Sequence, residues 1–267
     1  MKFKSIDNNL QPTFEAFNYQ HDAFEAIKNK DYFGVFHEQG LGKTKIGIDL
    51  ALHWLKEEAC DVVIFCTKKN LVKNWEDEIK IHTSIRPLTF SANRKENFDT
   101  FFAFAKVFIC HFDLVKNDLD NFLTFASLRK VGMILDESVA IKNPKSQMSQ
   151  AFHKLAPSLT RRIIMTGTPV DNRPYDTWSQ IYFLDQGEAL GENFKEFKKS
   201  YDFTKSMASN LIEQKVFAAS LKKLKNKIDG FTLRETKASC KINLPNKEYI
   251  RIETDFEENQ KNLYEKI

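Results

Sequence analysis

The sequence predicts a three-layer α/β fold in which a mostly parallel central sheet is covered by helices on both faces, with a helical insertion late in the chain. Short apolar segments alternate with amphipathic ones, which is typical of parallel strands separated by helices. Four of the nine glycines lie between Gly34 and Gly47, directly after one apolar segment. Another apolar segment ends in two adjacent carboxylates, Asp136 and Glu137.

Each expected element follows from its local pattern. Runs of β-branched and aromatic residues predict strands, whereas apolar residues three or four positions apart, such as Ile46, Leu50 and Trp54, predict helices. We expect strands at 32–36, 61–66, 106–110, 131–136 and 161–165, and helices at 20–29, from about 44 to 54, and at 70–81, 118–128 and 146–156.

The composition restricts the class of protein. With 267 residues, 42% hydrophobic and 28% charged, the chain is neither disordered nor fibrous. It contains no apolar run of membrane-spanning length and no secretory signal at its N-terminus, so we expect no membrane partner and a cytoplasmic location. The four cysteines and six histidines lack the spacing of disulfide frameworks or zinc sites. A net charge of +4 allows a nucleic-acid partner without requiring one.

The glycine cluster has the layout of a phosphate-binding loop. An apolar strand, then Gly40, Leu41, Gly42, Lys43 and Thr44, then a helix brings backbone N–H groups and a helix N-terminus to one anion. Lys43 is expected to reach the β- and γ-phosphates of ATP, and the Thr44 hydroxyl to bind Mg²⁺. His37 stands where the strict motif has its first glycine. The alternative is an ordinary glycine turn before a basic helix.

The two carboxylates after 131–135 supply the second half of such a site. Ligands of open α/β sheets bind at the carboxyl ends of strands. We therefore expect Asp136 to hold Mg²⁺ and Glu137 to polarise the attacking water. The alternative, a solvated acidic turn, is weakened by the Lys-Thr loop upstream.

Six motifs in order resemble the first RecA-like lobe of superfamily-two helicases, and specifically the Swi/Snf-like translocases of double-stranded DNA. The resemblance covers residues 15–267. The motifs are Phe17–Gln20 for the adenine, His37–Thr44, Lys69–Trp75 with Glu78, Cys110–Phe112, Asp136–Asn143, and Thr166–Pro169 with Asn172 and Trp178. A later stretch also resembles the family, at Leu233, Arg234, Lys237, Leu244, Pro245, Lys247, Gln260 and Tyr264.

The resemblance implies further roles. Gln20 would bond the adenine edge, while Lys69 and Asn70 (motif Ia), His111 (motif Ib) and Thr168 (motif III) would contact DNA backbone. For Trp75 and Trp178 we expect core packing rather than base stacking. The implied organisation is a lobe core at 1–185, a helical protrusion at 186–230, and a return to the lobe at 231–267 that leads toward a second lobe.

The expected protrusion is basic. Phe217, Leu221, Leu224 and Ile228 follow helical spacing, as do Phe194, Phe197 and Tyr201. Residues 195–227 hold nine lysines and three acidic residues, so Lys222 and Lys223 are expected to meet phosphates. The alternative is a solvated helix face.

Three features depart from the family. Val139 stands where His or Gln is usual, so the coupling of ATP to DNA is expected to run differently. Lys68 replaces a usual proline. Motifs IV to VI, with their arginine fingers, have no counterpart in these residues, and such fingers contribute roughly 10³–10⁵ in rate. We therefore expect weak turnover by this chain.

The sequence thus predicts the ATP-binding lobe of a DNA-dependent ATPase that moves on duplex DNA, with ATP and Mg²⁺ as cofactors and a second RecA-like lobe as partner. Three alternatives remain open. These are a nucleotide-dependent DNA-binding or scaffold module without efficient hydrolysis, a strand-separating superfamily-two helicase, and an unrelated P-loop kinase.

Overall fold

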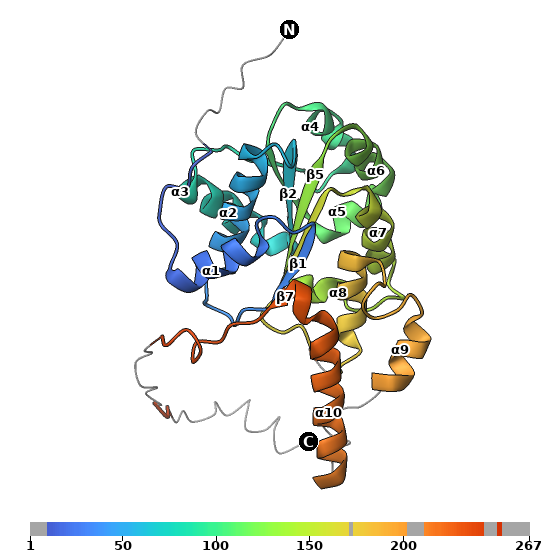
Figure 1. Ribbon diagram of the computed structural model, residues 1–267. Coiled ribbons are helices and arrows are strands. Elements are labelled where there is room, and N and C mark those ends of the chain that lie inside the picture. Colours follow the sequence, from blue (N-terminus) through green and yellow to red (C-terminus); the bar gives the residue numbers. More distant parts are fainter. Residues whose placement is uncertain (1–9, 171–172, 202–210, 243–249, 253–267) are drawn as a thin grey trace, which may run out of the picture.

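The computed structural model describes residues 10–170, 173–201, 211–242 and 250–252 (Figure 1). Several family-like positions lie outside the described residues, namely Asn172, Leu244, Pro245, Lys247, Gln260 and Tyr264. None of the described helices is both long and apolar enough to cross a lipid bilayer.

A seven-stranded sheet in the order β3-β4-β2-β5-β6-β1-β7 forms the middle layer, and every pairing in it is parallel. The order requires crossovers, which the helices provide. The strands are β1 (Tyr32–Val35), β2 (Val62–Thr67), β3 (Leu88–Thr89), β4 (Val107–His111), β5 (Val131–Asp136), β6 (Arg161–Met165) and β7 (Thr232–Leu233).

Helices cover both faces of the sheet (Figure 1). One face carries α1 (Asn18–Ile27), α2 (Lys43–Lys56) and α3 (Val72–His82). The other carries α4 (Phe98–Phe102), α5 (Phe112–Asn117), α6 (Leu119–Leu128), α7 (Gln147–Leu155) and α8 (Asp176–Asp185), with α9 (Phe194–Tyr201) and α10 (Leu211–Ile228) beyond them. Short 3-10 turns are η1 (Lys69–Leu71), η2 (Arg94–Asn97), η3 (Ser138–Ile141), η4 (Ala156–Ser158) and η6 (Asp229–Phe231).

The sheet separates two hydrophobic cores. Along β2, Ile64 and Cys66 enter one core, whereas Val63 and Phe65 enter the other. All six residues of this strand are buried, because both of its faces are covered. The continuous apolar runs in the sequence are the direct result of that burial.

The expected three-layer parallel fold is confirmed, as are the five expected strands and five expected helices to within a few residues. The sequence did not predict β3, β7, α4, α5 or α8. The two strands are two residues long, so they have no measurable alternation. In α8, eight of ten residues are buried, which removes the polar face that an amphipathic pattern needs.

The helical spacing expected late in the chain corresponds to α9 and α10. Leu224 and Ile228 of α10 are buried against the main body, whereas the first half of the helix extends away from it (Figure 1). The division at residues 185 and 230 remains a prediction.

Candidate nucleotide-binding site

Three strands end at the same level of the sheet. In the register, Met165 of β6 is paired with Val35 of β1 on one side and with Asp136 of β5 on the other. The glycine loop, the carboxylates and the Thr166–Pro169 segment therefore begin side by side at one edge. Parallel pairing alone accounts for this meeting of segments that are far apart in the sequence.

The glycine loop turns through two left-handed residues, Gly40 (φ 84°) and Gly42 (φ 65°), before α2 begins at Lys43. A Cβ at Gly42 would lie 2.2 Å from Nε2 of Gln20, so a side chain there would displace the Gln20 amide, and the left-handed backbone would be strained for any residue but glycine. The Lys43 ammonium donates to the carbonyls of His37 at 3.0 Å and of Glu38 at 3.5 Å. The lysine thus lies inside the curve of the loop.

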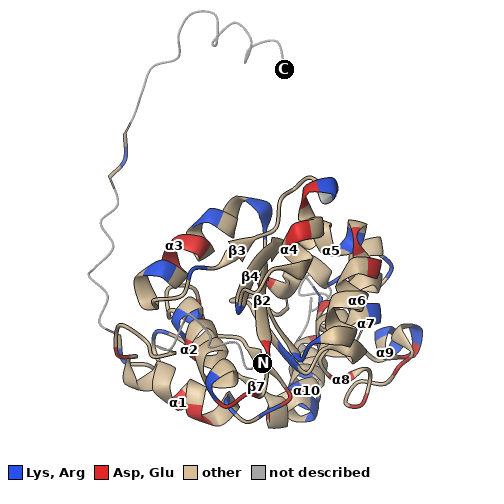
Figure 2. Cartoon of the chain, turned by 90° about the horizontal axis from the view of Figure 1, so that it is seen from above, with Lys and Arg blue, Asp and Glu red and all other residues tan. Residues whose placement is uncertain are grey.

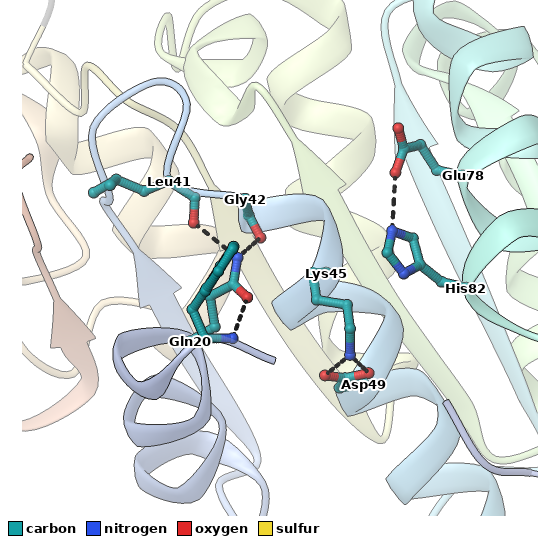
Figure 3. A network of polar contacts seen from close by, with 8 residues as sticks. Gln20, Leu41, Gly42, Lys45, Asp49, Glu78 and His82 are labelled. Carbon is teal, nitrogen blue, oxygen red and sulfur yellow. Dashed lines mark hydrogen bonds and ion pairs between the residues drawn. The ribbon is translucent and has the colours of Figure 1, made fainter. Parts of the chain in front are cut away.

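Gln20 is buried and holds the loop (Figure 3). Its Nε2 donates to the carbonyls of Leu41 at 3.3 Å and Gly42 at 3.5 Å, and its Oε1 accepts from the backbone N–H of Phe17 at 3.0 Å. The amide therefore connects the start of α1 to the loop, a role that the sequence did not indicate. The expected bond from Gln20 to an adenine edge remains a prediction.

Asp136 ends β5 and is held by side chains from other elements. Its Oδ2 accepts from the indole N–H of Trp75 at 2.8 Å and from the Thr67 hydroxyl at 3.5 Å. Burial raises the pKa of Asp136, and the Trp75 bond and the Lys43 charge oppose that rise. Core packing of Trp75, stacked on Phe65 at 4.6 Å between ring centroids, is confirmed, but its bond to Asp136 was not foreseen.

Glu137 has a left-handed backbone, with φ 58°. This conformation is costly for a residue with a side chain and occurs chiefly where the surroundings impose it. Its Oε2 accepts from the hydroxyl of Thr166 at 3.4 Å. The turn therefore directs the carboxylate of Glu137 toward the loop that follows β6.

These residues surround one cavity of about 720 Å³, large enough for a nucleotide. Burial lowers the pKa of Lys43, and the nearby Glu137 and Asp136 oppose that change. Leu41, also in the loop, is fully buried and is not among the residues that line the cavity. The lining includes Gln20, Gly40, Gly42, Lys43, Thr44, Asp136 and Glu137.

Two polar pairs from neighbouring helices add to this region, and the sequence analysis missed them. Lys45 is paired with Asp49 along α2, and His82 with Glu78 along α3, at 3.4 Å between Nε2 and Oε2 (Figure 3). Lys45, Glu78 and His82 also line the cavity. A lysine four positions before an aspartate in the helix was the available signal.

His37 is tied to the chain's later stretch. Its Nδ1 accepts from the backbone N–H of Glu235 at 3.3 Å, while the backbone N–H of Lys237 donates to the Glu38 carboxylate at 2.8 Å. Burial lowers the pKa of His37 to about 4, so the ring is neutral at pH 7. A neutral histidine thus anchors residues 235–237 beside the phosphate loop.

The residues expected to meet DNA fall into two groups. Lys69 and Asn70 in η1 and Thr168 after β6 are exposed, and they follow strands that end at the same edge of the sheet as the cavity. His111, at the end of β4, is only 8% exposed, and burial lowers its pKa. His111 is therefore less available to phosphates than the others, and its contact remains a prediction. Lys222 and Lys223 are exposed on α10, which contributes none of its described residues to the lining of the cavity.

Comparison with known proteins places these features in a family. Residues 34–267 match the SNF2-related domain. An uncharacterized ATP-dependent helicase of Mycoplasma genitalium is 26% identical over 98% of this chain and 24% of its own length. The ISWI chromatin-remodeling complex ATPase of Saccharomyces cerevisiae is 26% identical over 90% of this chain and 21% of its own length.

A solved structure agrees with the fold. The SWI2/SNF2 ATPase core of Sulfolobus solfataricus in complex with double-stranded DNA superposes with a TM-score of 0.67 at 23% identity, over 90% of this chain and 48% of that chain. The chain thus spans about a quarter of the length of these curated relatives.

Proposed function

Because the chain belongs to the SNF2-related domain family, we propose that it is the ATP-binding N-terminal lobe of a DNA-dependent ATPase that moves on duplex DNA. The proposal rests on the register of the sheet, in which Met165 is paired with both Val35 and Asp136. Because of this register, the glycine loop and both carboxylates lie around one cavity. A cytoplasmic location remains a prediction.

In this proposal the loop binds the triphosphate. Gly42, Lys43 and Thr44 line the cavity at the start of α2, and the N–H groups and ammonium there would be paired with phosphate oxygens. Glu137 would accept a hydrogen bond from the attacking water, since its carboxylate lines the cavity and is oriented by Thr166. Gln20 would contact the adenine while also holding the loop.

The donors present suit Mg²⁺. Thr44 and Asp136 supply a hydroxyl and a carboxylate to the same cavity, and hard oxygen ligands are what this ion prefers. When bound, the ion would neutralise charge on the phosphates. The Trp75 hydrogen bond favours the ionised form of Asp136 that such binding requires.

DNA would lie across the exposed Lys69, Asn70 and Thr168, with α10 as a second, basic contact through Lys222 and Lys223. Contacts of this kind are made to the phosphates and sugars of DNA. Binding should therefore be independent of the DNA sequence and should weaken as the salt concentration rises. We propose that full turnover needs a second RecA-like lobe, because no described residue of the cavity is an arginine that could act as a finger.

The test is nucleotide binding by the 267-residue chain, measured by titration calorimetry with ATP and Mg²⁺. We expect Lys43→Ala to abolish measurable binding and the exposed Lys154→Ala on α7 to leave it unchanged. Equal affinity in the Lys43→Ala variant and the unmodified chain would refute the proposal.

Hydrolysis separates the alternatives. We expect Glu137→Gln to retain ATP and to lose the small turnover of the chain. If turnover is absent both with duplex DNA and with a supplied second lobe, the scaffold alternative holds. Strand separation by the assembled protein would instead favour the helicase alternative.

A further inference from the structure

A buried glutamine connects the carboxylate loop to the loop that follows β6. Gln180 lies in α8 and is fully buried. Its Oε1 accepts from the hydroxyl of Ser138 at 2.8 Å, and its Nε2 donates to the carbonyl of Pro169 at 3.0 Å. One side chain thus bonds residues that directly follow Glu137 and Thr168.

The orientation of this amide is determined by its partners. Nε2 also donates to the carbonyl of Asp176 at 3.1 Å, so both of its hydrogens face carbonyl oxygens. A flipped amide would direct Oε1 at two groups that can only accept, which is unfavourable in a buried site. Ser138, also fully buried, must then donate to Oε1. The hydrogen bonds that join Ser138, Gln180 and Pro169 therefore form one network in which each donor and acceptor is fixed.

The network runs parallel to a direct contact between the same two loops. Thr166 donates to Glu137, and the Thr166 hydroxyl in turn accepts from the backbone N–H of Thr168 at 3.2 Å. Val139, the neighbour of Ser138, has no polar side-chain atom and cannot add a bond. Among the described residues, the route through Gln180 thus reaches Pro169 from the carboxylate side without passing through Thr166.

We propose that Gln180 is a positioning residue, which passes a change at the nucleotide carboxylates to the Thr166–Pro169 loop. The inference rests on the proposed function, because it needs nucleotide at Glu137 and DNA at Thr168. A bound triphosphate that shifts the turn at Glu137 displaces Ser138, and Gln180 carries that displacement to Pro169. A buried network of hydrogen bonds, closely packed on all sides, transmits such shifts better than an apolar contact does.

The test uses the 267-residue chain and amide hydrogen exchange over residues 166–170, with and without ATP and Mg²⁺. We expect nucleotide to slow exchange of this segment several-fold in the unmodified chain. In Gln180→Met, which keeps the length of the side chain, we expect ATP affinity within about threefold of the original and no such slowing. Gln147→Met, at an exposed glutamine of α7, is the matched control and should behave as the unmodified chain.

A second variant separates signalling from stability. Ser138→Ala combined with Gln180→Met removes one of the polar groups that the single change leaves buried without a partner. We expect the double variant to regain thermal stability relative to Gln180→Met. Its rate of amide hydrogen exchange at 166–170 should still be the same with and without nucleotide. A merely structural role for Gln180 predicts that the response returns together with stability.

The outcomes are distinguishable. If the unmodified chain binds ATP but exchange at 166–170 does not change, or if Gln180→Met keeps the full response, the role of Gln180 is refuted and the proposed function stands. If the unmodified chain binds no ATP, the proposed function fails and the role of Gln180 fails with it.

Discussion

At the scale of single residues, the chemistry of Asp136 depends on a partner from another element. Trp75, in α3, donates to its carboxylate, and Lys43, in α2, adds a positive charge nearby. Both lower the pKa of Asp136 against the effect of burial. The tryptophan therefore has two functions, because its ring fills the core while its N–H holds a proposed Mg²⁺ ligand.

Trp75→Phe keeps most of the ring packing and removes only the donor. We expect affinity for ATP with Mg²⁺ to fall by at least about tenfold, since a hydrogen bond to a charged group contributes about 1.5–3 kcal/mol. The pKa of Asp136 should rise further, so the acid limb of the pH dependence of binding should move to higher pH. Titration calorimetry between pH 5 and 8 measures both effects.

Trp178→Phe is the matched control. It is the same substitution at a buried tryptophan whose N–H donates to Gly191 at 3.0 Å, away from Asp136. It should destabilise the fold without moving the acid limb. A shift of the acid limb in both variants, or in neither, would contradict the assignment to Asp136.

At the scale of elements, α2 packs closely on the sheet because glycines stand where they meet. A Cβ at Gly132 of β5 would lie 2.9 Å from Cε3 of Trp54 and 3.0 Å from Sγ of Cys60. A Cβ at Gly47 of α2 would lie 3.3 Å from Cε of Met165. The close approach of α2 sets the position of Lys43 relative to Asp136.

Gly132→Ala should therefore destabilise the chain by about 1–2 kcal/mol. The overpacking cost of about 1–3 kcal/mol exceeds the gain of about 0.5–1 kcal/mol that alanine brings by restricting the unfolded chain. Gly230→Ala is the control, because no atom lies within 4 Å of the added Cβ, and it should be neutral or slightly stabilising. Urea unfolding monitored by circular dichroism measures both, and equal midpoints would show that the space at Gly132 is not limiting.

At the scale of the whole molecule, α10 extends from the body (Figure 1), and it carries Lys side chains, as other helices such as α3 and α9 also do (Figure 2). The helix carries five lysines and one acidic residue. Its apolar residues Leu224 and Ile228 are buried, so the lysines between them face solvent. The helix is therefore anchored to the body at one end only and presents its lysines to solvent. This arrangement is suited to binding a polyanion.

Charge reversal of Lys222, Lys223 and Lys225 to Glu should weaken binding of duplex DNA. The slope of log affinity against log salt should fall in magnitude by about 0.9 for each phosphate that the helix no longer neutralises, or roughly 2–3 in total. Reversal of Lys56, Lys130 and Lys154, three exposed lysines outside α9 and α10, changes the net charge equally and should affect the slope less. Fluorescence anisotropy at several salt concentrations makes the comparison, and identical slopes would show that α10 is only a solvated helix.

The sequence by itself determined the parallel α/β class, the principal strands and helices, and the phosphate loop with its carboxylates. These features are local, since they depend on periodicity, on glycine conformation and on short spacings. Only the tertiary structure decided which side chains meet. The bonds of Trp75 to Asp136, of Gln20 to the loop and of Gln180 to Ser138 and Pro169 join residues that are 11 to 61 positions apart. No local pattern encodes such contacts, because they arise from the order of the strands and the level at which they end.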